Sequence, residues 1–206
     1  LYNYRNTSLL RLATASIARE RTLSSHWKLK YGAKYTYNEI NSASQYRYEN
    51  AGVWVPSVVD DFDISYAENI GAAYATATMN YGRISAVVGL RGEYTYSDAR
   101  ESGVSQKYFS LFPNANLSVA LDKSGKHSLV AQYSRSIARP NFWNLTPNRK
   151  QISDYTFQSG NPLLKPQYTD NITVTAVVAY KYSLTLGMDI RHDAIQQIVL
   201  QDPNNP

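Results

Sequence analysis

The sequence of 206 residues contains no cysteine, 2 methionines and 5 phenylalanines, and it lacks a long uninterrupted apolar run. The absence of cysteine excludes disulfides and thiolate metal sites. Without an apolar run of about 20 residues the chain has no transmembrane helix, although a transmembrane β-barrel stays open. No basic N-terminal segment precedes an apolar core, so a signal peptide is not recognisable.

Clustered charges and catalytic motifs are also scarce. The net charge of +5 is spread along the chain without basic blocks, which argues against a nucleic-acid-binding protein. The three histidines, His26, His127 and His192, lack metal-ligand spacing. The acidic stretch 60–63 lacks the glycine and distal glutamate of a calcium loop, so we interpret it as solvated. We therefore expect no enzyme, no cofactor and no metal site.

Tyrosine, in contrast, is abundant, with 18 residues, and it suits a boundary between apolar and polar media. Apolar and polar residues alternate with period two along much of the chain, and no stretch has a convincing helical period. We therefore predict an all-β fold, an antiparallel meander of about eight long strands. The predicted spans are 7–18, 25–38, 64–79, 82–97, 108–122, 126–138, 167–180 and 182–195. Several are longer than the roughly five or six residues usual in soluble proteins.

Most of these spans separate apolar from polar side chains. In 25–38, for example, Trp27, Leu29 and Tyr31 share one side and the lysines share the other. A lipid-facing Lys or Arg at the bilayer centre costs about 2–4 kcal/mol, so the polar side should face the lumen of a barrel. The expected lumen-facing residues are Lys28, Lys30, Lys34, Arg83, Arg91, Glu93, Asp189 and Arg191. The spans 7–18 and 64–79 show no clear face, and their orientation stays open.

A soluble β-sandwich also alternates apolar and polar residues, and alternation alone favours it. The connections favour a membrane barrel, because outer-membrane barrels combine short periplasmic turns with longer extracellular loops. Tight turns are expected near 18–25, 80–82, 122–126 and 180–182, and long segments near 39–63, 98–107 and 139–166. Aromatic residues would then form two girdles, with Tyr35, Tyr37, Tyr94, Tyr96 and Tyr168 outside and Trp27, Tyr180 and Tyr182 inside.

Eight strands in this orientation would leave an unpaired strand edge at each end of the sheet, which lipid does not tolerate. We therefore expect residues 1–206 to be a partial outer-membrane β-barrel domain. It would be an interior slice of a larger barrel in the bacterial outer membrane.

Two stretches carry a family resemblance: YSRSIARPNFWNLTP (Tyr133–Pro147) and SGNPLLKPQYTDNITV (Ser159–Val174). They resemble the barrel of TonB-dependent outer-membrane receptors, in particular the outer-membrane β-barrel family common in Bacteroidetes. Weaker matches precede them at 66–75, 89–95 and 112–121, and Gln167 departs from the glutamate usual there.

The resemblance implies a 22-stranded barrel whose lumen holds a plug domain. It also implies import of a small-molecule nutrient, such as a ferric siderophore, cobalamin, a glycan or a peptide, driven by TonB. The plug and the TonB-contacting segment would lie in a part of the protein that is not in this chain. Its other partner would be outer-membrane lipid.

Aromatic and basic residues in the long outer segments are the candidate ligand contacts, although such aromatics more often stabilise the loop itself. The candidates are Trp54, Arg139, Phe142, Trp143, Arg149, Tyr155 and Phe157. We expect the prolines and Gly160 in these segments to be structural. Two other classes stay open: a passive porin or adhesin barrel, and a soluble β-rich binding protein.

Overall fold

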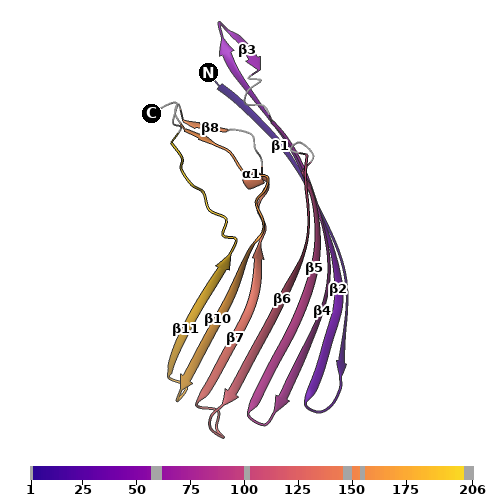
Figure 1. Cartoon of the computed structure of the whole chain (residues 1–206), viewed down its shortest axis with the longest axis vertical. Coiled ribbons are helices and arrows are strands. Elements are labelled where there is room, and N and C mark those ends of the chain that lie inside the picture. The colour runs from indigo at the N-terminus through magenta and orange to yellow at the C-terminus, as the bar shows by residue number, and fades with distance from the viewer. Residues whose placement is uncertain (1, 57–61, 100–102, 146–149, 154–155, 202–206) are drawn as a thin grey trace.

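The computed structural model describes residues 2–56, 62–99, 103–145, 150–153 and 156–201, and most of them form one curved antiparallel sheet (Figure 1). Neighbours in the sheet follow chain order, β1-β2-β4-β5-β6-β7-β10-β11, which confirms the predicted meander of eight long strands. Their bounds are β1 Tyr2–Thr22, β2 Trp27–Asn50, β4 Phe62–Tyr81, β5 Ile84–Ala99, β6 Val104–Ala120, β7 Ser128–Ala138, β10 Gln167–Val178 and β11 Tyr182–His192.

The remaining elements are short and lie at the outer end of the sheet. Strand β3 (Val53–Pro56) pairs with β2, and β8 (Lys150–Ser153) pairs with β9 (Thr156–Gln158) in a separate hairpin. The single helical turn α1 spans Phe142–Leu145. None of the described helices is long and apolar enough to cross a membrane.

The connections at the inner end are tight, as predicted, whereas two of the predicted long outer segments are mostly strand. Strand β2 continues to Asn50, and the chain reverses at Ala51 and Gly52, whose φ angles of 49° and 81° fit a type I′ hairpin turn. Strands β5 and β6 are separated by residues 100–103 alone. The predictions of long loops at 39–63 and 98–107 are therefore wrong, because polar strands extend beyond the amphipathic part of the sequence.

The pairing register sorts the side chains into two faces, because residues that are directly paired point to the same side of a sheet. One row across seven strands is apolar: Leu29, Ala77, Val88, Ala115, Tyr133, Ile172 and Met188. The next row is mostly polar: Lys30, Thr76, Gly89, Asn114, Ser134, Asn171 and Asp189. We call the face of the first row the apolar face and that of the second the polar face.

The register also orients the two strands that the sequence left open. Ala13, Ala15 and Ile17 of β1 lie opposite residues of the apolar face of β2. In β4 the middle of the apolar face consists of small residues: Gly71, Ala73, Ala75 and Ala77. Arg19 and Arg21 of β1 share this face next to the inner turn, where a long cationic side chain can extend to the interface.

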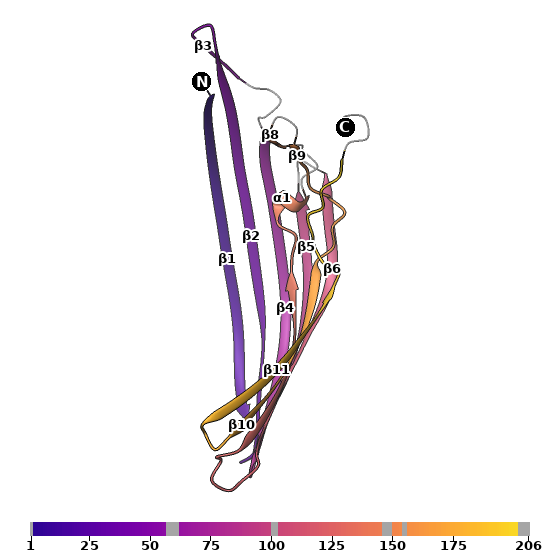
Figure 2. The same cartoon turned by 90° about the vertical axis from the view of Figure 1, so that its left-hand side faces the viewer.

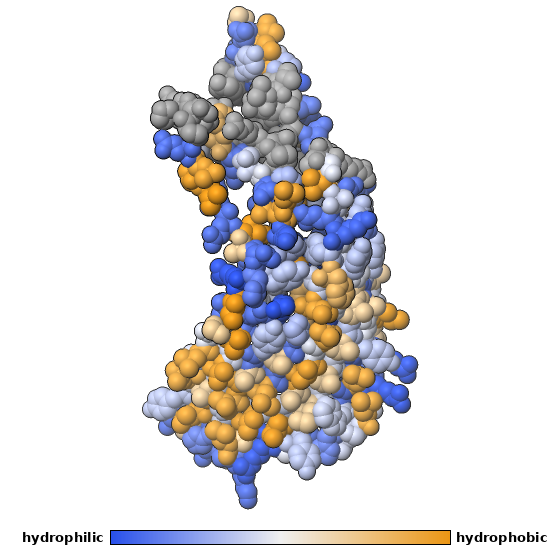
Figure 3. Space-filling model, in the orientation of Figure 1, coloured by the Kyte–Doolittle hydropathy of each residue, from blue (hydrophilic) through white to orange (hydrophobic). Residues whose placement is uncertain are grey.

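The apolar face is exposed in the isolated chain. Val88 is 60% exposed, Leu117 44% and Leu186 66%. Figure 3 shows hydrophobic residues gathered toward the inner end of the molecule, over the region of β10 and β11. Soluble monomers rarely expose a continuous apolar surface of this extent, whereas lipid solvates it.

A small core lies at the opposite, outer end, where polar and apolar side chains are buried together on the polar face. Its members include Thr95, Ser97 and Ala99 of β5, Ser110 and Phe112 of β6, and Leu145 of α1. Figure 2 shows α1 and the β8–β9 hairpin near this end of the sheet. This core contains the polar clusters described next.

Candidate functional site

The most enclosed polar cluster lies on the polar face of β4, β5 and β6. Arg139, which follows β7, extends into it: its Nη2 atom is 2.6 Å from Glu93 Oε2, and its Nε atom is 3.5 Å from Glu68 Oε1. Its guanidinium also donates hydrogen bonds to Tyr108 Oη at 3.1 Å and Thr95 Oγ1 at 3.4 Å. Both glutamates are buried. Arg139 is thereby held by three strands.

The charges of this cluster balance. Arg91 Nε lies 2.5 Å from the second oxygen of Glu93, and Asn38 Nδ2 donates a hydrogen bond of 3.4 Å to Glu68. Two arginines therefore face two glutamates, and neither carboxylate is buried without a partner. Removing one member would leave an uncompensated buried charge, which is strongly destabilising. The geometry thus assigns Arg139 to holding the start of the segment 139–166 on the sheet.

The end of this segment is attached to the same face. Gln106 Nε2 donates hydrogen bonds to the carbonyl oxygens of Pro162 and Leu164, at 3.3 and 2.9 Å. Within the segment, the Asn161 amide donates to the Asn144 carbonyl at 2.7 Å. Among the residues of the segment whose burial the structure describes, the apolar Pro140, Leu145 and Pro166 are buried. These contacts support the structural role expected for the prolines.

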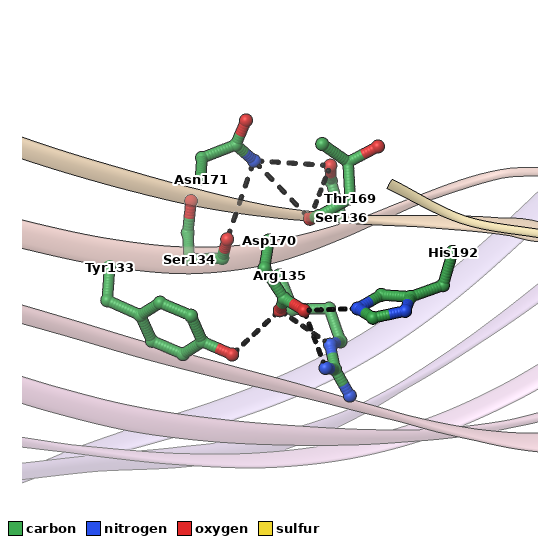
Figure 4. A network of polar contacts seen from close by, with 8 residues as sticks. All are labelled: Tyr133, Ser134, Arg135, Ser136, Thr169, Asp170, Asn171 and His192. Carbon is green, nitrogen blue, oxygen red and sulfur yellow. Dashed lines mark hydrogen bonds and ion pairs between the residues drawn. The ribbon is translucent and has the colours of Figure 1, made fainter. Parts of the chain in front are cut away.

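A second network joins β7, β10 and β11 (Figure 4). Arg135 donates two parallel hydrogen bonds of 2.7 Å, from Nε and Nη2, to the two oxygens of Asp170. Tyr133 Oη donates to the same carboxylate at 2.8 Å, and His192 Nε2 lies 3.2 Å from it. Asp170 is 7% exposed. Such bidentate charge-assisted bonds are strong and directional, so the network ties the outer ends of three strands together.

This network lies at register positions of the apolar face, which the sequence did not predict. Pairing of β6 with β7 ends at Asn114 and Ser134, and Figure 1 shows the two strands separating beyond that point. Tyr168, on the same side of β10 as Asp170, instead reaches Ser110 on the polar face of β6, with 2.6 Å between the hydroxyl oxygens. The outer parts of β7 and β10 therefore turn toward the polar face. The prediction that Tyr168 belongs to the outer aromatic girdle is wrong.

The candidate ligand contacts from the sequence lie in several elements, and some of them fall outside the described residues. Arg139 belongs to the buried cluster, Trp54 lies in β3, and Phe157 lies in β9 with 54% of its surface exposed. Phe142 and Trp143 lie in α1, but their side chains are outside the described part of the structure, as are Arg149 and Tyr155 entirely. A shared ligand site for these residues stays a prediction.

The candidate lumen-facing residues do share one face. The register places Lys28, Lys30, Lys34, Arg91, Glu93, Asp189 and Arg191 on the polar face. Arg83 precedes β5 and donates a hydrogen bond to the Leu121 carbonyl at the inner end. That the polar face lines a lumen stays a prediction. Within the described ranges, no three His, Asp or Glu side chains gather closely enough to hold a metal ion.

Sequence reasoning missed Glu68, Tyr108 and Asp170. The signal for Asp170 was present: Arg135 and Asp170 have opposite charges and both interrupt the apolar side of their strands. Two such interruptions in adjacent strands indicate a cross-strand pair. Glu68 and Tyr108 had no comparable signal, because their partner Arg139 is outside the strands.

The family model described as outer membrane protein beta-barrel family matches residues 2–206. The chain belongs to this family. It is therefore a β-barrel protein of the bacterial outer membrane, not an enzyme, and its apolar face is the surface that suits lipid.

Among solved structures, this family member is similar to the ferric citrate transporter FecA in the unliganded form. The TM-score is 0.49 at 13% sequence identity, over 84% of this chain and 26% of that chain. The chain thus spans about a quarter of the length of that protein. None of the curated proteins matches the sequence.

Proposed function

We propose that residues 1–206 form part of the barrel of a TonB-dependent receptor that imports a scarce nutrient across the outer membrane. Further strands of the same protein would pair with the free edges of β1 and β11 and close the barrel. A plug domain would fill the lumen, and TonB would act through a part of the protein outside this chain. The substrate class would be a ferric siderophore, cobalamin, a glycan or a peptide.

The observation that carries this proposal is the contact between the two stretches by which the chain resembles TonB-dependent receptors. Tyr133 and Arg135 of the first stretch bind Asp170 of the second. Arg139 of the first and Leu164 of the second are both attached to the polar face of the sheet. The described residues of these two stretches therefore contact each other and the sheet at the outer end, where a nutrient would arrive.

The polar face supplies a second argument. Lys28, Lys30 and Lys34 lie in one line along β2, and none of them forms an ion pair with another described residue. Charges in a barrel lumen need water or a partner of opposite sign. A plug domain that presents carboxylates to this line would provide such a partner, whereas a passive porin would leave the lysines in water.

Uptake by cells that produce the intact receptor tests the proposal. Radiolabelled ferric siderophores, cobalamin, glycans and peptides would be compared with the inner-membrane energy supply intact and after its loss. We expect uptake of one class, and we expect it to stop when the supply is lost. Uptake that continues unchanged without the supply would contradict energised import and favour a passive barrel.

A further inference from the structure

The outermost part of the sheet carries a cavity that the proposed transport function does not use. It has a volume of about 350 Å³ and is lined by Asn3, Arg5, Gln45, Arg47 and Trp54. These residues come from β1, β2 and β3, whose outer ends extend beyond the other strands in Figure 1.

The register places this cavity on the outward side of the sheet. Arg5 lies opposite Gln45, and Asn3 lies opposite Arg47. Arg5 and Ala13 are an even number of residues apart and so lie on the same side of β1, and Ala13 lies opposite Tyr37 on the apolar face. Trp54 lies opposite Glu49, which is on the same side of β2 as Arg47. The cavity therefore continues the lipid-facing side and not the polar face that would line the lumen.

The height of the cavity above the membrane limits which lipid groups can reach it. Ala13 lies at the level of the outer tyrosines, and Arg5 lies eight residues farther out along β1. At about 3.3 Å per residue and a strand tilt of about 40°, this is roughly 20 Å above the aromatic girdle. The headgroup layer of an ordinary phospholipid extends only about 5–8 Å beyond the hydrocarbon. A lipid headgroup that reaches the cavity must therefore be long, as the sugar chain of an outer-leaflet glycolipid is.

The side chains favour an anion that carries hydroxyl groups. Neither Arg5 nor Arg47 forms an ion pair with any residue that the structure describes, and both are exposed. A guanidinium binds phosphate or carboxylate through two parallel hydrogen bonds. The amides of Asn3 and Gln45 can bind hydroxyl groups, and the ring of Trp54, 44% exposed, offers an apolar surface.

Two acidic residues on this face, Glu49 and Asp63, form no ion pair with Arg5 or Arg47. Glu49 lies opposite Trp54, and Asp63 lies opposite Ala43 of β2. Lower on the same face, Glu39 is occupied by Arg11, with 3.2 Å between the charged atoms. We propose that the cavity binds an anionic, phosphorylated sugar in the headgroup of an outer-leaflet glycolipid, on the outside of the barrel and apart from the transport path.

The test measures binding of deacylated, phosphorylated lipopolysaccharide headgroup to the intact protein in detergent. We expect the double variant Arg5→Gln with Arg47→Gln to lower the affinity at least tenfold. Each substitution removes charge-assisted hydrogen bonds, and the loss of one such bond lowers the affinity by about a factor of ten. Lys123→Gln with Lys126→Gln removes the same charge at the inner end and should leave the affinity unchanged. Enzymatic removal of the phosphates should weaken binding to the wild-type protein, and Trp54→Ala should weaken it further than Trp54→Phe.

Three outcomes would overturn this proposal. They are no headgroup binding by the wild-type protein, equal headgroup binding by the arginine variant, and competition by inorganic phosphate that is as effective as competition by a free phosphorylated sugar. Nutrient uptake, measured in parallel, separates the two proposals. Loss of uptake in the arginine variant with unchanged headgroup binding would assign the cavity to the nutrient and not to the lipid. Equal amounts of inserted protein would show that each variant folds.

Discussion

Replacing Arg139 with methionine should release the segment 139–166 from the sheet. The change keeps much of the side-chain length but removes the charge that faces two buried carboxylates, 2.6 Å from Glu93 and 3.5 Å from Glu68. Breaking a buried ion pair by removing one partner typically costs about 3–5 kcal/mol. Glu93 keeps Arg91, whereas Glu68 keeps an amide hydrogen bond from Asn38. We therefore expect the low end of that range, about 3 kcal/mol.

A local loss of about 3 kcal/mol corresponds to a roughly 150-fold larger opening constant for the segment. Limited proteolysis of the inserted protein with chymotrypsin measures it, because cleavage at the buried Leu145 requires the segment to leave the polar face. Arg139→Met combined with Glu68→Gln should recover part of the protection, since Arg91 and Glu93 then remain as a pair of opposite charges. Arg191→Met, on the exposed polar face of β11, is the matched control.

The result that refutes this reasoning is equal cleavage of Arg139→Met and the wild-type protein. A double variant, Arg139→Met with Glu68→Gln, no better protected than the single variant would also refute it, because the cost would then come from lost packing and not from buried charge.

Three further predictions follow from the faces, the inner turns and the outer segment. Val88→Arg should cost about 2–4 kcal/mol and lower outer-membrane assembly, whereas Ser85→Arg should be mild; equal damage would contradict the lipid-facing assignment. Hydrogen bonds from Ser124 and the His127 amide lower the pKa of Asp122 from its ordinary 3.8 to about 2, so this carboxylate stabilises its turn above pH 3.8 and loses the effect as the pH falls toward 2. The protection of the His127 amide, its exchange rate relative to that of an unprotected amide at the same pH, should therefore fall over that range in the wild-type protein, with no such transition in Asp122→Asn. Removing residues 141–158 should weaken nutrient binding while the barrel still inserts, which binding and membrane fractionation measure together.

The strands and their faces were predictable because period-two alternation is local. Leu29 and Lys30 are neighbours in the sequence, and their opposite orientation follows from strand geometry alone. The outer extension of β2 was not predictable from hydrophobic periodicity, because residues 39–50 are mostly polar on both sides. Its signal lay in Gly52, whose φ of 81° glycine adopts readily, so that a tight reversal forms where a long loop was expected.

The candidate site was predictable only in part. Arg139 was singled out, but its partners Glu68 and Glu93 lie on strands far from it in the sequence, and their contact depends on how segment 139–166 folds back. The turn of Tyr168 toward Ser110 depends on the end of pairing between β6 and β7, which no local pattern records. The contacts of Arg139 and Tyr168 therefore depend on tertiary geometry, which local sequence patterns do not encode.

The measurement that tests the central claim most directly is the accessibility of spin labels to oxygen and to a polar nickel complex. Residues 1–206 contain no cysteine, so each introduced cysteine is the single labelling position in this part of the protein once any cysteine elsewhere is replaced by serine. In the intact protein in lipid nanodiscs, labels at Val88→Cys and Leu117→Cys should be more accessible to oxygen than to nickel, because both residues lie on the apolar face. Labels at Val87→Cys and Ser118→Cys, on the polar face, should not show this preference. The same preference at all four positions, or its reversal, would contradict a sheet whose apolar face contacts the outer membrane.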